Sequence, residues 1–139
     1  NGNLVGYSVT YITAGVYPAQ ITEITAGAYG KIGVLQFDNC KMSGTFTIPP
    51  AVQPTNIEIP MNPLLAAVNM QQESYANIVS FVVFGCGLLS INENLIGLDN
   101  SGKLNGFANF SGGTNAAPSG LGIAAKNSLL AKGWTVITN

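Results

Sequence analysis

The sequence contains no histidine and no arginine, and only 8% of its 139 residues are charged, against roughly 25% in a typical soluble domain. The lack of histidine excludes histidine-based catalytic triads, histidine general bases and metal sites that need imidazole ligands. The five basic residues are all lysines, they do not cluster, and the net charge is −1. Nucleic-acid binding needs clustered cations that displace counterions, so we expect no nucleic-acid partner.

Cysteine and long apolar runs are also scarce. The two cysteines, Cys40 and Cys86, are too few for a disulfide framework, and without histidine or further thiols they cannot form a zinc site. We expect both to be small buried hydrophobic side chains, with a disulfide between them as the alternative. The longest apolar run, residues 78–87, is too short to span a bilayer. We therefore predict no metal site, no cofactor and no membrane span.

A repeated spacing of apolar residues organises the chain. Residues 31–50 contain Ile32-x-x-Leu35-x-Phe37-x-x-Cys40-x-Met42. The spacing of Leu35 and Phe37 recurs at intervals of 24, 23 and 25 residues, in the pairs Ile59 and Met61, Val82 and Phe84, and Phe107 and Asn109. A unit of this length cannot bury its apolar row alone, so neighbouring units must stack. We therefore predict an α/β repeat solenoid with parallel β-strands on one face and mostly irregular return segments.

Some positions do not fit this pattern. Pro60 would remove a backbone donor inside the second strand, and Asn56 stands where an apolar residue is expected. Either this unit is distorted or its register is off by a residue. Among the return segments, residues 64–72 are the best candidate for a helix, because Pro63 stands near the start. Residues 88–101 favour extended or 3₁₀ connections.

The C-terminal segment has the clearest local signals. Residues 111–120 are a loop by composition, residues 122–132 are predicted as a helix, and residues 134–139 as a final short strand. Gly133 is the expected left-handed residue after the helix, and Trp134 is expected to pack back across it. A helix and a strand at this place would cover the open end of a stacked core.

These patterns divide the chain into three parts. We predict residues 1–30 as an irregular first coil or the end of a preceding segment, residues 31–110 as repeat coils of about 24 residues, and residues 111–139 as a C-terminal cap. The sequence begins without methionine, so we expect a processed product or a part of something longer. Because the N-terminal edge offers no evident cover, we expect more chain or a neighbouring subunit against it.

The pattern of residues 31–50, with Ser43-Gly44 and Ile48-Pro49, resembles the leucine-rich-repeat family. The segment 111–139 is similar to the closing segment of repeat proteins from Bacteroidetes-type bacteria and their phages. In the family, an asparagine or a cysteine follows each strand. The predicted register places there Cys40, Leu64, Gly87 and Gly112, and of these only cysteine is a usual substitute.

The resemblance implies that the outward strand face binds a partner. The expected function is non-enzymatic recognition or adhesion, through a protein or glycan ligand, by an extracellular, cell-surface or virion-surface domain. An alternative is a structural subunit of a phage virion, fibre or surface layer, and we expect a homo-oligomer or a larger assembly. The predicted outward residues are mostly neutral and partly apolar, as interfaces often are: Val34, Gln36, Asp38, Ile57, Glu58, Asn62, Phe81 and Val83.

Carboxylates offer one further hypothesis. Asp38 and Glu58 are expected on adjacent strands of the outward face, where a pair of acids would suit glycosidase-like chemistry. A carbohydrate-active enzyme on a β-solenoid is therefore the third hypothesis, and two solvated surface acids are the simpler explanation. Asp99-Asn100-Ser101-Gly102 lacks the alternating acidic ligands of a calcium loop, so we expect a turn there. No catalytic residue is predicted.

Overall fold

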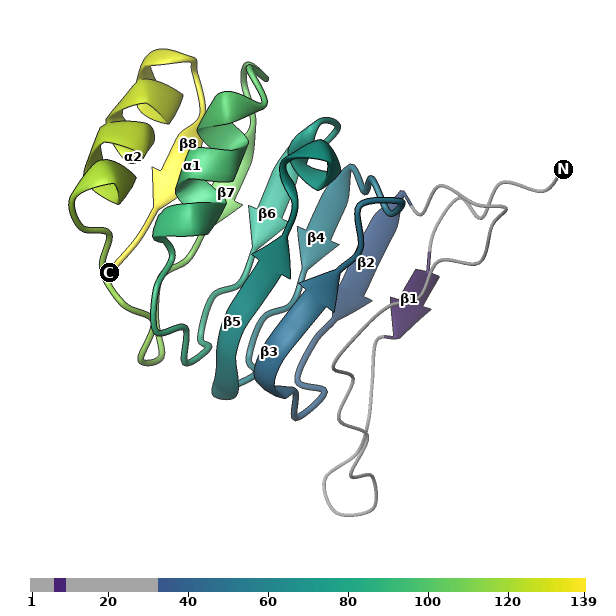
Figure 1. The fold of residues 1–139 in the computed structure, drawn as a ribbon. Helices are drawn as coiled ribbons and strands as arrows, with labels where there is room; N and C mark the ends of the chain where they lie inside the picture. The colour runs from purple at the N-terminus through teal and green to yellow at the C-terminus, as the bar shows by residue number, and fades with distance from the viewer. Residues whose placement is uncertain (1–6, 10–32) are drawn as a thin grey trace, which may run out of the picture.

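A computed structural model describes residues 7–9 and 33–139 of the chain (Figure 1). The predicted first coil, residues 1–30, lies outside the described residues except for positions 7–9. The described part is an α/β structure with parallel sheets and two α-helices. Six strands pair in sequence order and in parallel to form the larger sheet: β1 (Tyr7–Val9), β2 (Val34–Phe37), β4 (Asn56–Glu58), β6 (Ser80–Val82), β7 (Phe107–Asn109) and β8 (Thr135–Ile137).

Side chains of the larger sheet alternate between a buried and an outward position. In β2, Leu35 and Phe37 are buried while Val34 and Gln36 are partly exposed, and the later strands repeat this alternation. Strand pairing aligns the buried residues into rows across the sheet. The first buried row is Leu35, Ile57, Phe81, Ala108 and Val136, and the second is Phe37, Ile59, Val83 and Phe110.

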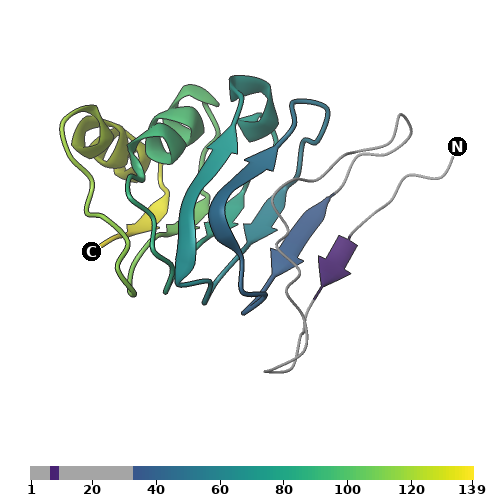
Figure 2. The ribbon, with the colours of Figure 1, turned by 60° about the horizontal axis from the view of Figure 1, so that its bottom comes forward.

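A second layer packs over the buried side of the larger sheet. It contains the two-stranded parallel sheet of β3 (Ser43–Ile48) and β5 (Leu64–Met70), and then α1 (Asn92–Asn100) and α2 (Leu121–Ala131). Figures 1 and 2 show these four elements side by side along the sheet, in chain order. The short helix η1 (Gln72–Tyr75) follows β5.

Edge-to-face ring contacts occur in the core, one between the two layers and one between neighbouring strands of the larger sheet. The ring centroids of Phe37 and Phe46 are 5.5 Å apart, and those of Phe81 and Phe110 are 5.2 Å apart. The buried side chain of Asn94 joins α1 to its neighbours, because its amide donates to the Val68 carbonyl oxygen of β5 and to the Tyr75 hydroxyl.

The predicted strand register is wrong after β2. The pairing intervals from Leu35 onward are 22, 24, 27 and 28 residues, so a nearly constant period misplaces the later strands. Three of the side chains predicted to point inward are instead exposed: Met61, Phe84 and Phe107. The expected conflicts in the second unit also disappear, because Asn56 takes an outward position in β4 and Pro60 lies after the end of that strand.

Two predictions about the return segments are wrong as well. Residues 64–72 were expected to favour a helix, but residues 64–70 form β5, whose backbone groups pair with β3. Residues 88–101 were expected to be extended or 3₁₀, but they include α1. Local propensity does not decide either segment, because the partners that satisfy or cover them are distant in sequence.

Local signals predicted the C-terminal segment correctly. The helix α2 begins and ends within one residue of the predicted bounds, and β8 lies inside the predicted final strand. Gly133 has a φ of 81°, as expected for a left-handed residue after a helix. Trp134 is buried, and its ring fills the space where an added Cβ at Gly106 would lie. In the described part of the chain, neither helix is long and apolar enough to cross a membrane.

Candidate functional site

The outward face of the larger sheet is the candidate site, because it aligns side chains from five strands that the core does not use. Strand pairing places them in rows that run across the sheet. One row is Val34, Asn56, Ser80, Phe107 and Thr135, and the next is Gln36, Glu58, Val82, Asn109 and Ile137. All ten residues are partly or fully exposed.

The character of this face changes along the sheet. At β2 and β4 it is polar and carries Gln36, Asn56 and Glu58. At β6 to β8 it becomes partly apolar, because Val82, Phe107 and Ile137 share the outward side with the polar residues Ser80, Asn109 and Thr135. Phe84, two residues after the end of β6, adds a further exposed apolar side chain. The exposed fractions of Phe84, Phe107 and Ile137 are 37%, 36% and 40%. We call Val82, Phe84, Phe107 and Ile137, together with Met61, the apolar patch.

Met61 joins the patch at the turn between β4 and β5. Its backbone amide donates to the Phe84 carbonyl oxygen at 2.9 Å, and its side chain is 49% exposed. Its sulfur atom lies 2.8 Å from the place where a Cβ at Gly85 would be, so glycine there leaves room for it. Met61 has a φ of 60°, a left-handed conformation that is unfavourable for a bulky residue.

Similar backbone turns follow β2, β4 and β6, and a longer turn with two positive-φ glycines follows β7. A residue with positive φ comes first in each: Asn39, Met61, Gly85 and Gly112. A buried residue with a hydrogen-bonding side chain comes next or shortly after: Cys40, Asn62, Cys86 and Asn115. These turns position the end of the outward face.

Asn62 ties two neighbouring turns together. Its Nδ2 donates to the Phe37 carbonyl oxygen at 2.8 Å, and its Oδ1 accepts from the Met42 backbone amide at 3.1 Å. Asn115 repeats the arrangement, since its Nδ2 donates to the Val83 carbonyl oxygen at 2.8 Å and its Oδ1 accepts from the Leu88 amide at 2.8 Å. These side-chain amides form hydrogen bonds with buried backbone groups. Without a partner, such groups would reduce the free energy of unfolding.

The cysteines occupy the alternate turns. The Sγ atom of Cys86 donates to the Ile59 carbonyl oxygen at 3.2 Å and accepts from the backbone N–H of Asn62 at 3.4 Å. Burial raises the pKa of both thiols, Cys40 and Cys86, although backbone hydrogen bonds to Cys86 act in the opposite direction. Both are buried thiols, as predicted, and the raised pKa keeps them protonated and therefore poor nucleophiles.

The buried residues of these turns differ from those that were predicted to follow the strands. Cys40 is at its predicted place, but Asn62, Cys86 and Asn115 replace Leu64, Gly87 and Gly112. The signal was present in the sequence. Ile57-x-Ile59-x-x-Asn62 and Phe81-x-Val83-x-x-Cys86 have the same spacing as Leu35-x-Phe37-x-x-Cys40.

Half of the predicted binding-face residues lie on the outward side. Val34, Gln36 and Glu58 are partly exposed on it, and Asp38, also partly exposed, follows the end of β2. The prediction that the other four point outward is wrong, because their side chains are buried: Ile57, Asn62, Phe81 and Val83. The apolar patch was not predicted, because the predicted register places Met61, Val82, Phe84 and Phe107 in the core.

Among the residues that the structure describes, the carboxylates do not converge on a metal site. Within the described residues, no group of three or more histidine, cysteine, aspartate or glutamate side chains could hold a metal ion. Glu58 pairs across the sheet with Gln36, so Asp38 and Glu58 occupy neighbouring strands without directly facing each other.

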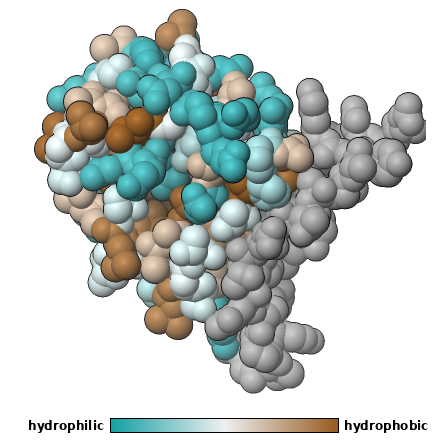
Figure 3. All heavy atoms as spheres, in the orientation of Figure 1, coloured by the Kyte–Doolittle hydropathy of each residue, from teal (hydrophilic) through white to brown (hydrophobic). Residues whose placement is uncertain are grey.

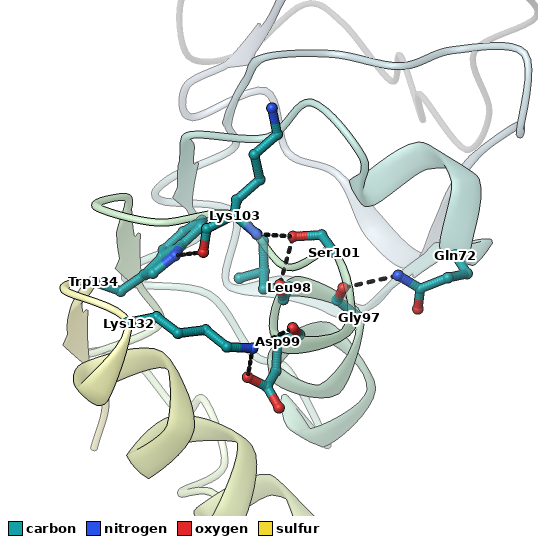
Figure 4. A network of polar contacts seen from close by, with 8 residues as sticks. All are labelled: Gln72, Gly97, Leu98, Asp99, Ser101, Lys103, Lys132 and Trp134. Carbon is teal, nitrogen blue, oxygen red and sulfur yellow. Dashed lines mark hydrogen bonds and ion pairs between the residues drawn. The ribbon is translucent and has the colours of Figure 1, made fainter.

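Asp99 belongs to a structural network at the C-terminal end of α1 (Figure 4). Lys132 Nζ lies 2.6 Å from Asp99 Oδ1 and 2.7 Å from the Asp99 carbonyl oxygen. Trp134 Nε1 donates to the Lys103 carbonyl oxygen at 2.8 Å, which connects β8 to the segment before β7. The network therefore holds α1, α2 and β8 together and supports the apolar end of the sheet.

The second layer forms the side of the described structure opposite the outward face (Figure 1). Figure 3 shows the side that carries β3, β5, α1 and α2, where hydrophobic side chains form separate groups among hydrophilic ones.

No protein-family model matches the chain, and neither does any curated protein or solved structure.

Proposed function

We propose that the chain is a non-enzymatic recognition domain, built as a short solenoid of the leucine-rich-repeat type, that binds a protein or glycan on the outward sheet face. Support for the repeat comes from the turns after β2, β4, β6 and β7. They share a residue with positive φ and a buried asparagine or cysteine that bonds to the neighbouring turn or to its own strand end. Solenoids present such aligned strand faces to their partners.

The observation that carries the binding proposal is the conformation and exposure of Met61. The equivalent turn positions hold Asn39, Gly85 and Gly112, which are the residue types that adopt positive φ most easily. Met61 bears the conformational cost and still exposes its side chain, next to the backbone of Phe84 and Gly85. Strain at an exposed apolar side chain has no benefit for folding, and strained residues cluster at binding sites.

The composition of the face indicates the kind of partner. Phe84 and Phe107 offer flat apolar surfaces, and amide and carboxylate groups stand nearby on Asn56, Glu58 and Gln36. Aromatic rings with adjacent hydrogen-bonding groups suit the apolar and hydroxyl faces of a sugar, and they equally suit a protein surface. The low charge and amide-rich composition accord with an extracellular or virion-surface setting.

Met61→Gly provides the sharpest test, because it separates folding from binding. Glycine relieves the positive φ, so we expect stability to stay the same or rise by up to about 1 kcal/mol. Loss of the side chain should weaken partner binding at least severalfold. Binding is measured with labelled protein on arrays of glycans and of extracellular protein domains, and stability by urea unfolding.

A matched pair of variants defines the surface. The double variant Phe84→Ser and Phe107→Ser should lose binding while it remains folded. Leu89→Ser is the control, because Leu89 is 81% exposed and lies outside the outward rows. If the Phe84 and Phe107 double variant and Met61→Gly both bind every hit of the native chain with unchanged affinity, the outward face is not the binding site.

A structural subunit is the second candidate function. The apolar patch would then contact a neighbouring subunit in an assembly. Its support comes from an additional uncovered surface at the C-terminal end of the sheet, described next.

A further inference from the structure

The helix α2 has an exposed apolar side at the end of the molecule. Its buried residues Gly122, Ala125 and Leu129 face the core and α1. Lys126 marks the side next to the final strand, because its Nζ donates to Thr138 Oγ1 at 2.8 Å. Ile123 and Leu130 stand three and four residues from Lys126 and therefore share that side of the helix.

These two side chains remain largely uncovered. The exposed fractions of Ile123 and Leu130 are 48% and 46%. Figure 1 shows α2 and β8 together at one end of the molecule, with α1 on the inner side of α2. The predicted helix and strand are present in the C-terminal segment, but Ile123 and Leu130 give the helix an exposed apolar side, whereas the terminal cap of a solenoid normally has a polar outer face.

The backbone of β8 is also open along this end. Within the described residues, β2, β4, β6 and β7 each pair on both sides, while β8 pairs with β7. The Thr135 amide donates to Gly106 and the Ile137 carbonyl accepts from Phe110, so these groups face β7. The N–H and C=O of Val136, between them, point away from β7.

Nothing in the sequence of this edge opposes pairing. Residues 135–139 contain no proline and no charged side chain, although natural edge strands usually carry one or the other as protection. This end of the described structure is formed by Ile123, Lys126, Leu130 and residues 135–139. Among these residues, Lys126 alone has a charged side chain. The surface is therefore nearly neutral and offers no charge pattern for a charged partner.

We propose that this C-terminal end face, composed of Ile123, Leu130 and the open edge of β8, binds the same face of a second copy of the chain. A two-fold axis would pair the two β8 edges in antiparallel fashion around Val136 and continue the sheet from one copy into the next. It would also set the two α2 helices antiparallel. Ile123 lies three residues before and Leu130 four residues after Lys126, the middle residue of α2, so in an antiparallel pair of helices Ile123 of one copy would meet Leu130 of the other.

Lys126 gives the arrangement an electrostatic signature. It lies between Ile123 and Leu130, so the two-fold axis brings two ammonium groups into the same region. Two like charges that lie close together repel each other, and salt screens the repulsion. Dimerisation should therefore strengthen with ionic strength, and Lys126→Gln should strengthen it further.

Sedimentation of the 139-residue chain over a range of concentrations tests the proposal. We expect a reversible monomer–dimer equilibrium, weakened at least about tenfold by Leu130→Lys, because a charge would then enter the apolar contact. Leu89→Lys, at an exposed leucine away from the end face, should leave the equilibrium unchanged. Circular dichroism confirms that both variants fold.

Disulfide trapping locates the contact. An oxidised equimolar mixture of Ile123→Cys and Leu130→Cys chains should form the mixed covalent dimer faster than either variant forms its own. A monomer at all concentrations would overturn the proposal, and so would a dimer insensitive to Leu130→Lys. Assembly through the end face alone stops at a dimer, so growth beyond a dimer that persists when Phe84 and Phe107 are both replaced by serine would also overturn it. None of these outcomes depends on partner binding at the outward sheet face.

Discussion

The side-chain amide of Asn62 lies 2.8 Å from the carbonyl oxygen of Phe37, a residue 25 positions earlier in the chain. The bond connects the turn after β4 to the end of β2, and the same amide group also accepts from the backbone of Met42. Both backbone groups are buried, so water cannot replace the side chain. Asn62 thus links strand pairing to the turn that shapes the outward face.

Asn62→Ala should destabilise the protein by about 2–4 kcal/mol, because it leaves two or more buried backbone groups without their partner. Asn69→Ala is the control, since Asn69 is exposed on β5 and the change should cost less than about 0.5 kcal/mol. Urea unfolding measures both. Equal midpoints for the two variants would show that the Asn62 side chain does not carry this part of the fold.

Tyr75 should make the protein sensitive to alkaline pH. Burial raises its pKa to about 12; the hydrogen bond from Asn94 opposes this shift, and the charge of Glu93 adds to it. Because the folded pKa lies above the unfolded value, the stabilising contribution is present below pH 10 and is lost as the pH rises toward 12. A shift of this size corresponds to about 2–3 kcal/mol.

Tyr75→Phe removes this ionisation and keeps the ring beside Gly97. We expect the variant to lose less stability than the native chain between pH 9 and 11 in urea unfolding experiments, since the unfolded-state pKa of tyrosine is about 10. If the two stability curves run parallel over this range, the Tyr75 hydroxyl is not buried as described.

The pair of Asp99 and Lys132 should give the opposite pH dependence. Partial burial acts to raise the pKa of Asp99, but hydrogen bonds from Lys132 and Ser128 and the charge of Lys132 outweigh burial and lower it. The contribution is therefore present above the unfolded pKa of the carboxyl and is lost as the pH falls through the folded pKa. Asp99→Asn should cost about 1 kcal/mol at neutral pH and almost nothing in strong acid.

A double-mutant cycle with Lys132→Met isolates this pair. The coupling free energy should be about 0.5–1 kcal/mol at pH 7 and should fall with rising salt, because the pair is partly exposed. A coupling that stays the same at pH 2 and pH 7 would mean that the Asp99 charge is not responsible.

The sequence alone predicted those elements whose signals are local. The final helix and strand follow from a loop, an apolar helix and Gly133, all within one continuous segment. The parallel-strand architecture followed from the spacing in residues 31–50. In contrast, β5 could not be predicted, because the backbone of β3 supplies the pairing that makes it a strand.

The predicted strand register was wrong for a different physical reason. Around β6 the sequence has apolar residues at both alternate positions, with Phe81 and Val83 on one side and Val82 and Phe84 on the other. Hydrophobic alternation cannot choose between the two sides there. The buried hydrogen-bonding residue three positions after the second core residue decides it: Cys40, Asn62 and Cys86 mark the same point in three strands.

The apolar patch was missed through the same error, since an outward phenylalanine looks like a core residue when the register is shifted by one. The part of the face on β2 and β4 could be predicted, because Val34, Gln36 and Glu58 point outward there as expected.

Hydroxyl-radical footprinting of the six phenylalanines is a direct test of the strand register, because all six lie in the described residues and divide cleanly by exposure. Phe84 and Phe107 should be oxidised several times faster than the four buried rings of Phe37, Phe46, Phe81 and Phe110. Rapid oxidation of Phe81 or Phe110 with protection of Phe84 would contradict the strand register, and with it the outward face on which the proposed function rests.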